Sequence, residues 1–438
     1  MSDSTDPAAA PSSDSGLVRA IGVRQLTASI VNVTIGAGIF VLPASVAMSL
    51  GAAAPAAYLV CAMAMALVVT SFALAGSRVS VTGGIYAYAE AAFGPFVGVL
   101  AGVVQYTVLW FTAASLLSAF ADQVGLLVPA AASGLPRALV IAATVALLAL
   151  VNVRGVRPGA RLIEAVTITK LLPLLLLVGA GVFSLDPAQL AWPGWPGGDA
   201  IGRTVLLLIF AFAGIEVALV PSGEVRDPER TVPRAIGLAL AVTTLLYLAI
   251  QAVAQGVLGP ELRSEASAPL AAAAARLFGE GGRLLVLVGA MVSMFGYLSG
   301  DMLASPRSIF AFGRDALLPR ALAAVHPRFR TPYLAIGVHA LLIAALAVTS
   351  AFTRLALLSN VGVLTLYILG CAAALRFVWR PAAGAAGGLH LPGEKLIPAA
   401  AIAVLVWILA HATGQELLVL VATLGAAALL YLVRRARA

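Results

Sequence analysis

Charged side chains are scarce in this chain. Only 11% of its 438 residues are Asp, Glu, Lys or Arg, whereas about 25% is usual in soluble globular proteins. Apolar residues make up 61%, and the mean hydropathy is +1.02. This composition excludes a soluble globular protein and is typical of a polytopic membrane protein.

Lysine and cysteine are nearly absent as well. The two lysines are Lys170 and Lys395, and every other basic residue is an arginine. Because these arginines form no dense patch or arm, the net charge of +8 does not indicate a nucleic-acid partner. Cys61 and Cys371 lie in apolar runs, where thiols usually pack as small apolar groups and do not form disulfides. No obligate protein partner, metal or cofactor is implied.

Long apolar stretches, separated by clusters of Arg, Pro and Gly, predict twelve membrane-spanning helices. A helix needs about 20 apolar residues to cross the bilayer, so the fold class is an all-α polytopic membrane protein. We place the spans at about 25–49, 54–76, 96–120, 136–153, 161–183, 201–222, 234–258, 283–310, 332–350, 355–379, 394–412 and 415–433.

The basic residues predict the orientation of these spans, because Lys and Arg near span ends accumulate on the cytoplasmic side. With the N-terminus inside, 20 of the 27 basic residues fall in the cytosol, and Lys170 lies within the membrane. We therefore expect a multi-pass protein of the cytoplasmic membrane with both termini cytosolic. The six basic residues expected outside are Arg137, Arg203, Arg263, Arg276, Arg283 and Arg354.

Two of the spans carry glycine at mid-membrane and proline shortly after it. Span one has Gly36, Gly38 and Pro43, and span six has Gly214 and Pro221. We expect both helices to be interrupted there. Unwound backbone at membrane depth is tolerated only where it faces protein or a cavity, so the two interruptions predict a site between them. Spans one and six each open a block of five spans, which predicts inverted repeats, as in many secondary transporters.

Four motifs in the expected order along the spans make the chain resemble the amino acid, polyamine and organocation (APC) superfamily, of the bacterial amino acid permease type. They are GAGIF at 36–40, GGIYAY at 83–88, GEVRDPERTVPRAI at 223–236 and RDALLP at 314–319.

The resemblance implies a LeuT-type fold of five plus five inverted spans with two further helices, and amino acid transport as the commonest activity. We expect a disordered cytosolic tail at 1–16 and a ten-helix core at 17–380, with repeats at about 24–183 and 200–380. A cytosolic linker at 381–393 and two accessory helices with a basic tail at 394–438 complete the chain.

An amino acid needs partners for its carboxylate and its ammonium when both leave water. Free N–H groups of Gly36, Ala37 and Gly38, at the positive end of a half-helix, suit the carboxylate. The family pattern indicates free carbonyls at Thr34, Phe210 and Ala213 for the ammonium, with the Phe210 ring as an inner gate. The alternative is that Gly36 and Gly38 only permit close helix packing. The whole set expected to bind substrate is Thr34, Ile35, Gly36, Ala37, Gly38, Ile39, Phe210, Ala211, Ala213, Gly214 and Glu216.

Lys170 lies about ten residues into span five, where a charged side chain is expensive to hold. In permeases that this chain resembles, the matching lysine occupies the place of a sodium ion and bonds to carbonyls at the span-one break. We hypothesise that protons couple to transport through Lys170, which disfavours sodium coupling. The alternative is a permanently charged structural clamp in a facilitator or exchanger.

Glu216 is the other intramembrane charge of note. It either accepts N–H bonds from the unwound segment or faces the substrate side chain and favours a cationic substrate such as a polyamine. Other intramembrane polar residues, among them Tyr106 and Asn360, either line the pocket or serve helix packing. His339 has no metal-like companion, so a ligand role is disfavoured.

The chain shows no catalytic pair typical of an intramembrane enzyme and no repeated filter motif typical of a channel. The predicted function is secondary active transport of an amino acid by alternating access, with protons, the substrate and the lipid bilayer as partners. The alternatives are an amino acid or polyamine exchanger without proton coupling, and a transporter-like nutrient sensor.

Overall fold

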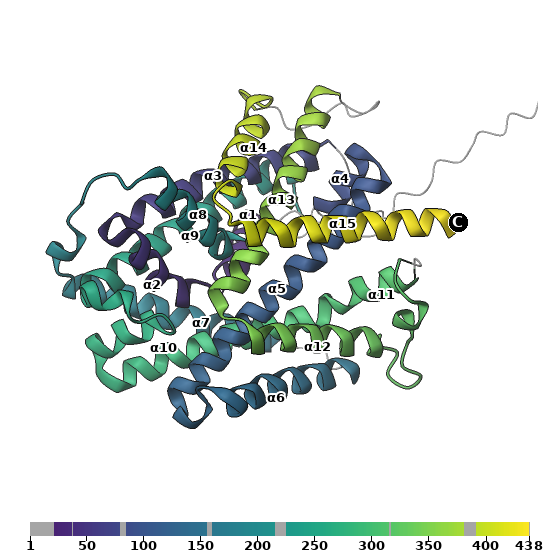
Figure 1. Ribbon diagram of the computed structural model, residues 1–438. Coiled ribbons are helices and arrows are strands. Elements are labelled where there is room, and N and C mark those ends of the chain that lie inside the picture. The colour runs from purple at the N-terminus through teal and green to yellow at the C-terminus, as the bar shows by residue number, and fades with distance from the viewer. Residues whose placement is uncertain are drawn as a thin grey trace, which may run out of the picture.

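The computed structural model describes residues 22–36, 38–78, 85–155, 160–214, 225–314, 317–380 and 391–437, and these form α-helices joined by short 3-10 helices and loops (Figure 1). The predicted tail at 1–16 and most of the linker at 381–393 lie outside this range. The helices are α1 (Val23–Thr34), α2 (Gly38–Leu50), α3 (Ala54–Gly76), α4 (Ile85–Phe93), α5 (Pro95–Leu127), α6 (Gly134–Val153), α7 (Ala160–Gly181), α8 (Gly198–Phe212), α9 (Pro228–Leu258), α10 (Pro269–Ala304), α11 (Pro306–Arg314), α12 (Tyr333–Thr349), α13 (Phe352–Trp379), α14 (Leu396–Leu409) and α15 (Gly414–Arg437).

Length and composition mark many of these helices as membrane spans. Within the described residues, seven helical stretches are long and apolar enough to cross a bilayer, and three shorter apolar helices lie beside them. The chain is thus an all-α, multi-pass membrane protein, as its composition predicts. The count of twelve spans and the inverted repeat stay predictions. The seven stretches are Gly38–Gly76, Pro95–Leu127, Gly134–Val153, Arg230–Arg263, Pro269–Arg314, Phe352–Trp379 and Gly414–Ala436.

Two ion pairs join helix ends that the predicted alternation of spans assigns to the same face. Arg203, near the start of α8, makes two bonds of 2.6 and 2.7 Å to Glu416, near the start of α15. Arg78, just after α3, lies 2.9 Å from Glu394, just before α14. These pairs hold together helix ends that are far apart in the sequence, and the orientation of the spans stays a prediction.

The helix at the predicted eighth span, 283–310, has different bounds from the prediction. The helix α10 starts at Pro269, and it bends at Gly279, whose φ of 67° lies in the left-handed region. The charged Arg276 and Glu280 resemble loop residues in the sequence, but their side chains are mostly exposed on the helix surface. The C-terminal end falls at Ala304, because Pro306 starts the separate helix α11.

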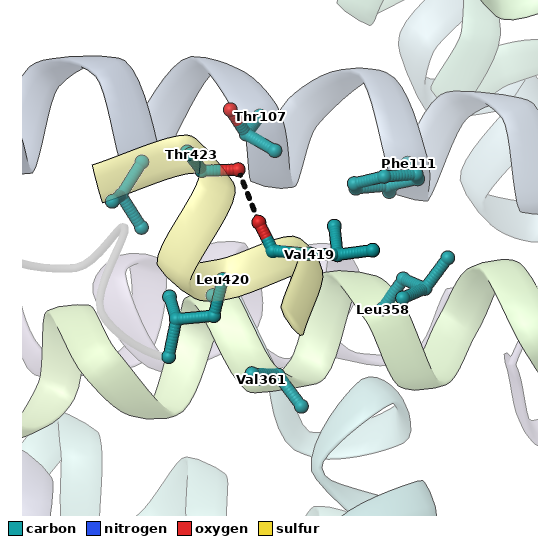
Figure 2. Close-up of a pocket in the computed structure, with 9 residues that line it drawn as sticks. Thr107, Phe111, Leu358, Val361, Val419, Leu420 and Thr423 are labelled. Carbon is teal, nitrogen blue, oxygen red and sulfur yellow. Dashed lines mark hydrogen bonds between the residues drawn. The ribbon is translucent and has the colours of Figure 1, made fainter. Parts of the chain in front are cut away.

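The interrupted helices lie inside the bundle. Helix α1 packs against α9, α2 packs against α8, and α3 packs against both α8 and α9. Helix α15 instead packs against α5 and α13 (Figure 1). A small crevice lies between these three helices (Figure 2). Its lining is apolar except for one threonine from α5 and one from α15. The crevice is lined by Val104, Thr107, Phe111, Leu358, Val361, Gly362, Val419, Leu420 and Thr423.

Candidate functional site

The first helix is interrupted where its glycines predict. Helix α1 ends at Thr34 and α2 begins at Gly38. Between them, the Gly36 N–H donates to the Thr34 carbonyl at 2.7 Å, and Ile35 has φ −72° and ψ 74°. These values describe an inverse γ-turn. Since an unbroken helix would direct the Gly36 N–H to the Asn32 carbonyl, this turn frees the Asn32 carbonyl for another donor.

The second interruption begins at Ala213. The Ala213 N–H makes the last helical bond of α8, to the Ile209 carbonyl at 2.8 Å, and Ala213 itself is extended at ψ 144°. Gly214 follows with φ +109°, a conformation that side chains rarely allow, so glycine is required there. The continuation of this segment, with Glu216, lies outside the described residues, and the two roles predicted for Glu216 stay open.

The two interruptions pack against each other reciprocally. A Cβ added to Gly38, just after the first break, would lie 3.1 Å from Cδ1 of Phe210 and 3.5 Å from Cα of Ala211. A Cβ added to Gly214, at the second break, would lie 3.1 Å from Cγ1 of Val33. The breaks therefore face each other. The alternative explanation for Gly38, close packing of helices, is consistent with these contacts.

Gly36 has different surroundings from the other glycines of the breaks. A Cβ on Gly36 would find no described atom outside its chain neighbours closer than 3.9 Å, where the carbonyls of Thr34 and Val33 lie. The described residues therefore give no packing reason for this glycine, and close approach by another molecule stays a predicted use of the missing side chain.

Lys170 reaches the first break, as predicted. Its side chain is 93% buried, and Nζ donates to the Asn32 carbonyl at 2.5 Å. This is the carbonyl that the turn at Gly36 leaves without its helical partner. Within the described part of the chain, no carboxylate pairs with Lys170, so backbone oxygen is what the ammonium binds.

Two of the groups expected to be free for the substrate are occupied. The Gly36 N–H is used in the turn, and the Thr34 carbonyl accepts both that N–H and the Tyr247 hydroxyl, which is 2.9 Å away. The same hydroxyl lies 2.9 Å from the carbonyl of Ala211 in the last turn of α8. Tyr247, on α9, thus connects the ends of both broken helices, and it is not among the residues predicted for the site.

A stripe of polar residues on α9 is the signal that could have found Tyr247. Thr243, Tyr247, Gln251 and Gln255 recur every four residues, so they share one face of the helix. All four are buried. Gln251 accepts from the Tyr58 hydroxyl at 3.1 Å, so the side chains of Tyr247 and Gln251 in the stripe are both hydrogen-bonded.

The remaining residues expected at the site lie at the ends of the two breaks. Phe210 is half-buried, and its ring meets Phe352 of α13 edge-on at a centroid distance of 5.4 Å. Ile35 and Ile39 are buried beside the first break, whereas Ala37 lies outside the described residues.

Other polar residues named from the sequence bind neighbouring helices. Asn360 donates to the carbonyls of Leu206 and Leu207 in α8, at 2.7 and 3.1 Å. Asn360 therefore holds α13 against the first half of the interrupted span, which is the packing role.

A buried network joins α5, α10 and α12, and two of its members, Asp301 and Ser305, were not predicted. The imidazole of His339 contacts the Tyr106 hydroxyl at 3.0 Å and Asp301 Oδ2 at 2.8 Å, and Ser305 bonds the other oxygen of Asp301. All four residues are at least 92% buried. No pattern in the sequence pairs Asp301 with a histidine 38 positions away.

Comparison with known proteins agrees with this architecture. Residues 21–432 match a family described as amino acid permease. The chain is 38% identical over 359 residues to an uncharacterized transporter of Mycobacterium tuberculosis, covering 78% of this chain and 76% of that one. It is 30% identical over 330 residues to the serine/threonine exchanger SteT of Bacillus subtilis (74% and 75%), and 26% identical over 416 residues to the branched-chain amino acid permease BcaP of the same species (91% and 89%). A multi-pass helical chain with this match over nearly its whole length belongs to the amino acid permease family.

Proposed function

We propose that the protein is a secondary active transporter that moves an amino acid across the cytoplasmic membrane by alternating access. The reciprocal packing of the breaks at Gly38 and Gly214 carries this proposal. Two interrupted helices that meet inside a bundle are the arrangement in which secondary transporters bind their substrates. A LeuT-type five-plus-five repeat with both termini in the cytosol is part of the proposal.

The substrate site lies between the breaks, and its members are Thr34 to Ile39 together with Phe210, Ala211, Ala213, Gly214 and Glu216. The substrate carboxylate binds at the start of α2, where the first N–H groups of a helix have no partner within the helix and the helix dipole favours an anion. The ammonium binds the carbonyls at the ends of α1 and α8. The lack of close described neighbours around Gly36 supports this placement.

Lys170 couples the transport to protons in this proposal. Its ammonium donates to a carbonyl of the first break, so loss of its proton would weaken the bond to Asn32 and change how the end of α1 is held. Among the described residues no carboxylate pairs with this buried ammonium, which supports a titratable role over a permanent charge. Exchange without proton coupling is the second candidate, and it is favoured by the similarity to SteT, which is named as an exchanger.

A thermal-shift screen of the purified protein against amino acids would identify the substrate class. A ligand that binds the folded state raises the melting temperature by mass action. The names of two relatives favour serine, threonine and the branched-chain amino acids as the first compounds to test. Polyamines belong in the same screen, because stabilisation by them would place Glu216 beside the ligand.

Uptake into proteoliposomes tests the coupling. We expect an inward proton gradient to drive accumulation of the identified amino acid in the wild type and in Lys395→Ala, whose lysine is exposed, but not in Lys170→Ala. Accumulation that survives Lys170→Ala would refute coupling through this lysine. Counterflow without any gradient-driven accumulation in the wild type would identify an exchanger, and binding without counterflow would identify a sensor.

A further inference from the structure

The hydroxyl of Tyr247 lies between the two breaks of the proposed site. It is 2.9 Å from the Thr34 carbonyl, where α1 ends, and 2.9 Å from the Ala211 carbonyl, in the last turn of α8. The side chain is fully buried. Its ring is held edge-on by Phe212 at a centroid distance of 5.2 Å and by Tyr58 at 6.4 Å. These ring contacts place the hydroxyl within reach of both carbonyls.

One hydroxyl cannot fully satisfy two carbonyls. A tyrosine hydroxyl carries a single hydrogen, so it donates well to one of these oxygens at a time. The Thr34 oxygen also accepts the Gly36 N–H at 2.7 Å. A protonated primary amine has three N–H donors, and its hydrogen bonds to carbonyls are strengthened by its charge. The two carbonyls around the hydroxyl therefore suit an ammonium better than they suit the tyrosine.

We propose that Tyr247 is a positioning residue whose hydroxyl stands in for the substrate ammonium at the carbonyls of Thr34 and Ala211 while the site is empty. This inference rests on the proposed function and adds the group that the substrate displaces. In the empty carrier, the hydroxyl offers its one hydrogen to these two buried carbonyls, and a buried carbonyl without a donor would be costly. When an amino acid binds, its ammonium takes over these oxygens.

Two consequences follow for specificity and for the transport cycle. Compounds that lack an ammonium offer no better donor than the tyrosine and gain little from the two carbonyls. With the Tyr247 hydroxyl at these carbonyls, the substrate-free carrier can change between its inward-open and outward-open states. Tyr247 therefore speeds this step of the transport cycle. Net uptake requires this step, whereas exchange of one substrate for another does not.

The test uses Tyr247→Phe, which keeps the ring, with Tyr58→Phe as the matched control. Tyr58 is equally buried, but its hydroxyl donates to the Gln251 side chain and touches neither break. Binding is measured for the twenty protein amino acids, and for the 2-hydroxy acid counterpart of the one that binds the wild type best. We expect Tyr247→Phe to bind that amino acid about fivefold more tightly, the equivalent of one net hydrogen bond. The 2-hydroxy acid should show no such gain, nor should Tyr58→Phe with the amino acid.

Equal or weaker binding of the amino acid by Tyr247→Phe would overturn the inference, as would the same gain in Tyr58→Phe. In proteoliposomes, Tyr247→Phe should slow net uptake relative to exchange, and an unchanged ratio would also overturn it. Failure of all twenty amino acids to bind the wild type would instead contradict the proposed function, and the inference with it.

A measurement on the tyrosine itself does not depend on the folding of the phenylalanine variant. With 3-fluorotyrosine placed at position 247 of the full chain, the fluorine resonance should move when the amino acid is added and stay in place with its 2-hydroxy acid. A resonance that ignores the bound amino acid would refute displacement of the hydroxyl.

Discussion

Gly36→Ala separates a packing role of this glycine from a binding role. The added methyl group would meet no described atom outside its chain neighbours closer than 3.9 Å, which is ordinary van der Waals contact. The φ of Gly36 lies outside the left-handed region, so alanine fits without backbone strain. Replacing glycine by alanine at a compatible position raises stability by about 0.4–1 kcal/mol through the unfolded chain. We therefore expect the ligand-free protein to melt at the same or a slightly higher temperature.

Binding should respond in the opposite direction. If the substrate lies against the backbone at Gly36, the methyl group takes its space, and overpacking of this kind costs about 1–3 kcal/mol. Each 1.4 kcal/mol is a factor of ten in affinity, so the dissociation constant should rise by about 5-fold to 150-fold. The assay is ligand-induced thermal stabilisation of the purified protein, titrated to give the affinity for the amino acid found in the screen.

Gly179→Ala, in α7, is the control, because a Cβ there also meets no described atom within 4 Å. It should raise the melting temperature slightly, as alanine inside a helix does, and leave the affinity unchanged. Wild-type affinity in Gly36→Ala would show that the substrate does not approach this backbone. A large loss of stability in the ligand-free variant would show instead that Gly36 serves packing.

Two further predictions concern hydrogen-bonded groups away from the breaks. Arg203→Gln removes the guanidinium that donates two hydrogen bonds to the mostly buried Glu416. We expect the free energy of unfolding to fall by about 1–3 kcal/mol, measured as a lower melting temperature. Arg276→Gln, whose pair with Glu261 is exposed, should change it by less than about 1 kcal/mol, and equal losses in the two variants would contradict this reasoning. Asp301→Ala removes the partner of both His339 and Ser305, and the free energy of unfolding should fall by about 2–6 kcal/mol. Tyr106→Phe removes one hydrogen bond and should cost about 1 kcal/mol. A lower melting temperature for Tyr106→Phe than for Asp301→Ala would contradict the buried network.

The interruptions were predictable because glycine and proline act on the local backbone. The glycines at 36, 38 and 214 predict positions where a helix ends or where another backbone comes close. Helix α1 ends at Thr34, α2 begins at Gly38 and α8 ends at Phe212, next to these glycines. The contact of Lys170 with the first break was predictable from the family resemblance. A lone lysine in an apolar span is a strong signal, because its charge demands a partner.

Tyr247 and Asp301 were not predictable in the same way. The partners of Tyr247 lie 213 and 36 positions away and are backbone oxygens, which leave no mark in the sequence. One buried tyrosine in an apolar helix resembles a packing residue, and only its place in a polar stripe distinguishes it. Asp301 finds its histidine through the packing of α10 against α12, which hydropathy does not specify.

The occupied turn at Gly36 has a related cause. The sequence predicts that the first helix ends near Gly36, but it does not predict which carbonyl accepts the Gly36 N–H. The structure directs that N–H to the Thr34 carbonyl two residues back and thereby frees the Asn32 carbonyl for Lys170. Local geometry at a break therefore decides which groups remain for a substrate.

A cryo-electron microscopy map of the protein with its amino acid bound would test the central claim most directly. We predict density for the amino acid between the breaks, with its carboxylate at the start of α2 and its ammonium at the carbonyls of Thr34 and Ala211. A ligand bound elsewhere in the bundle, or either helix continuous through Gly36 or Gly214, would contradict the account.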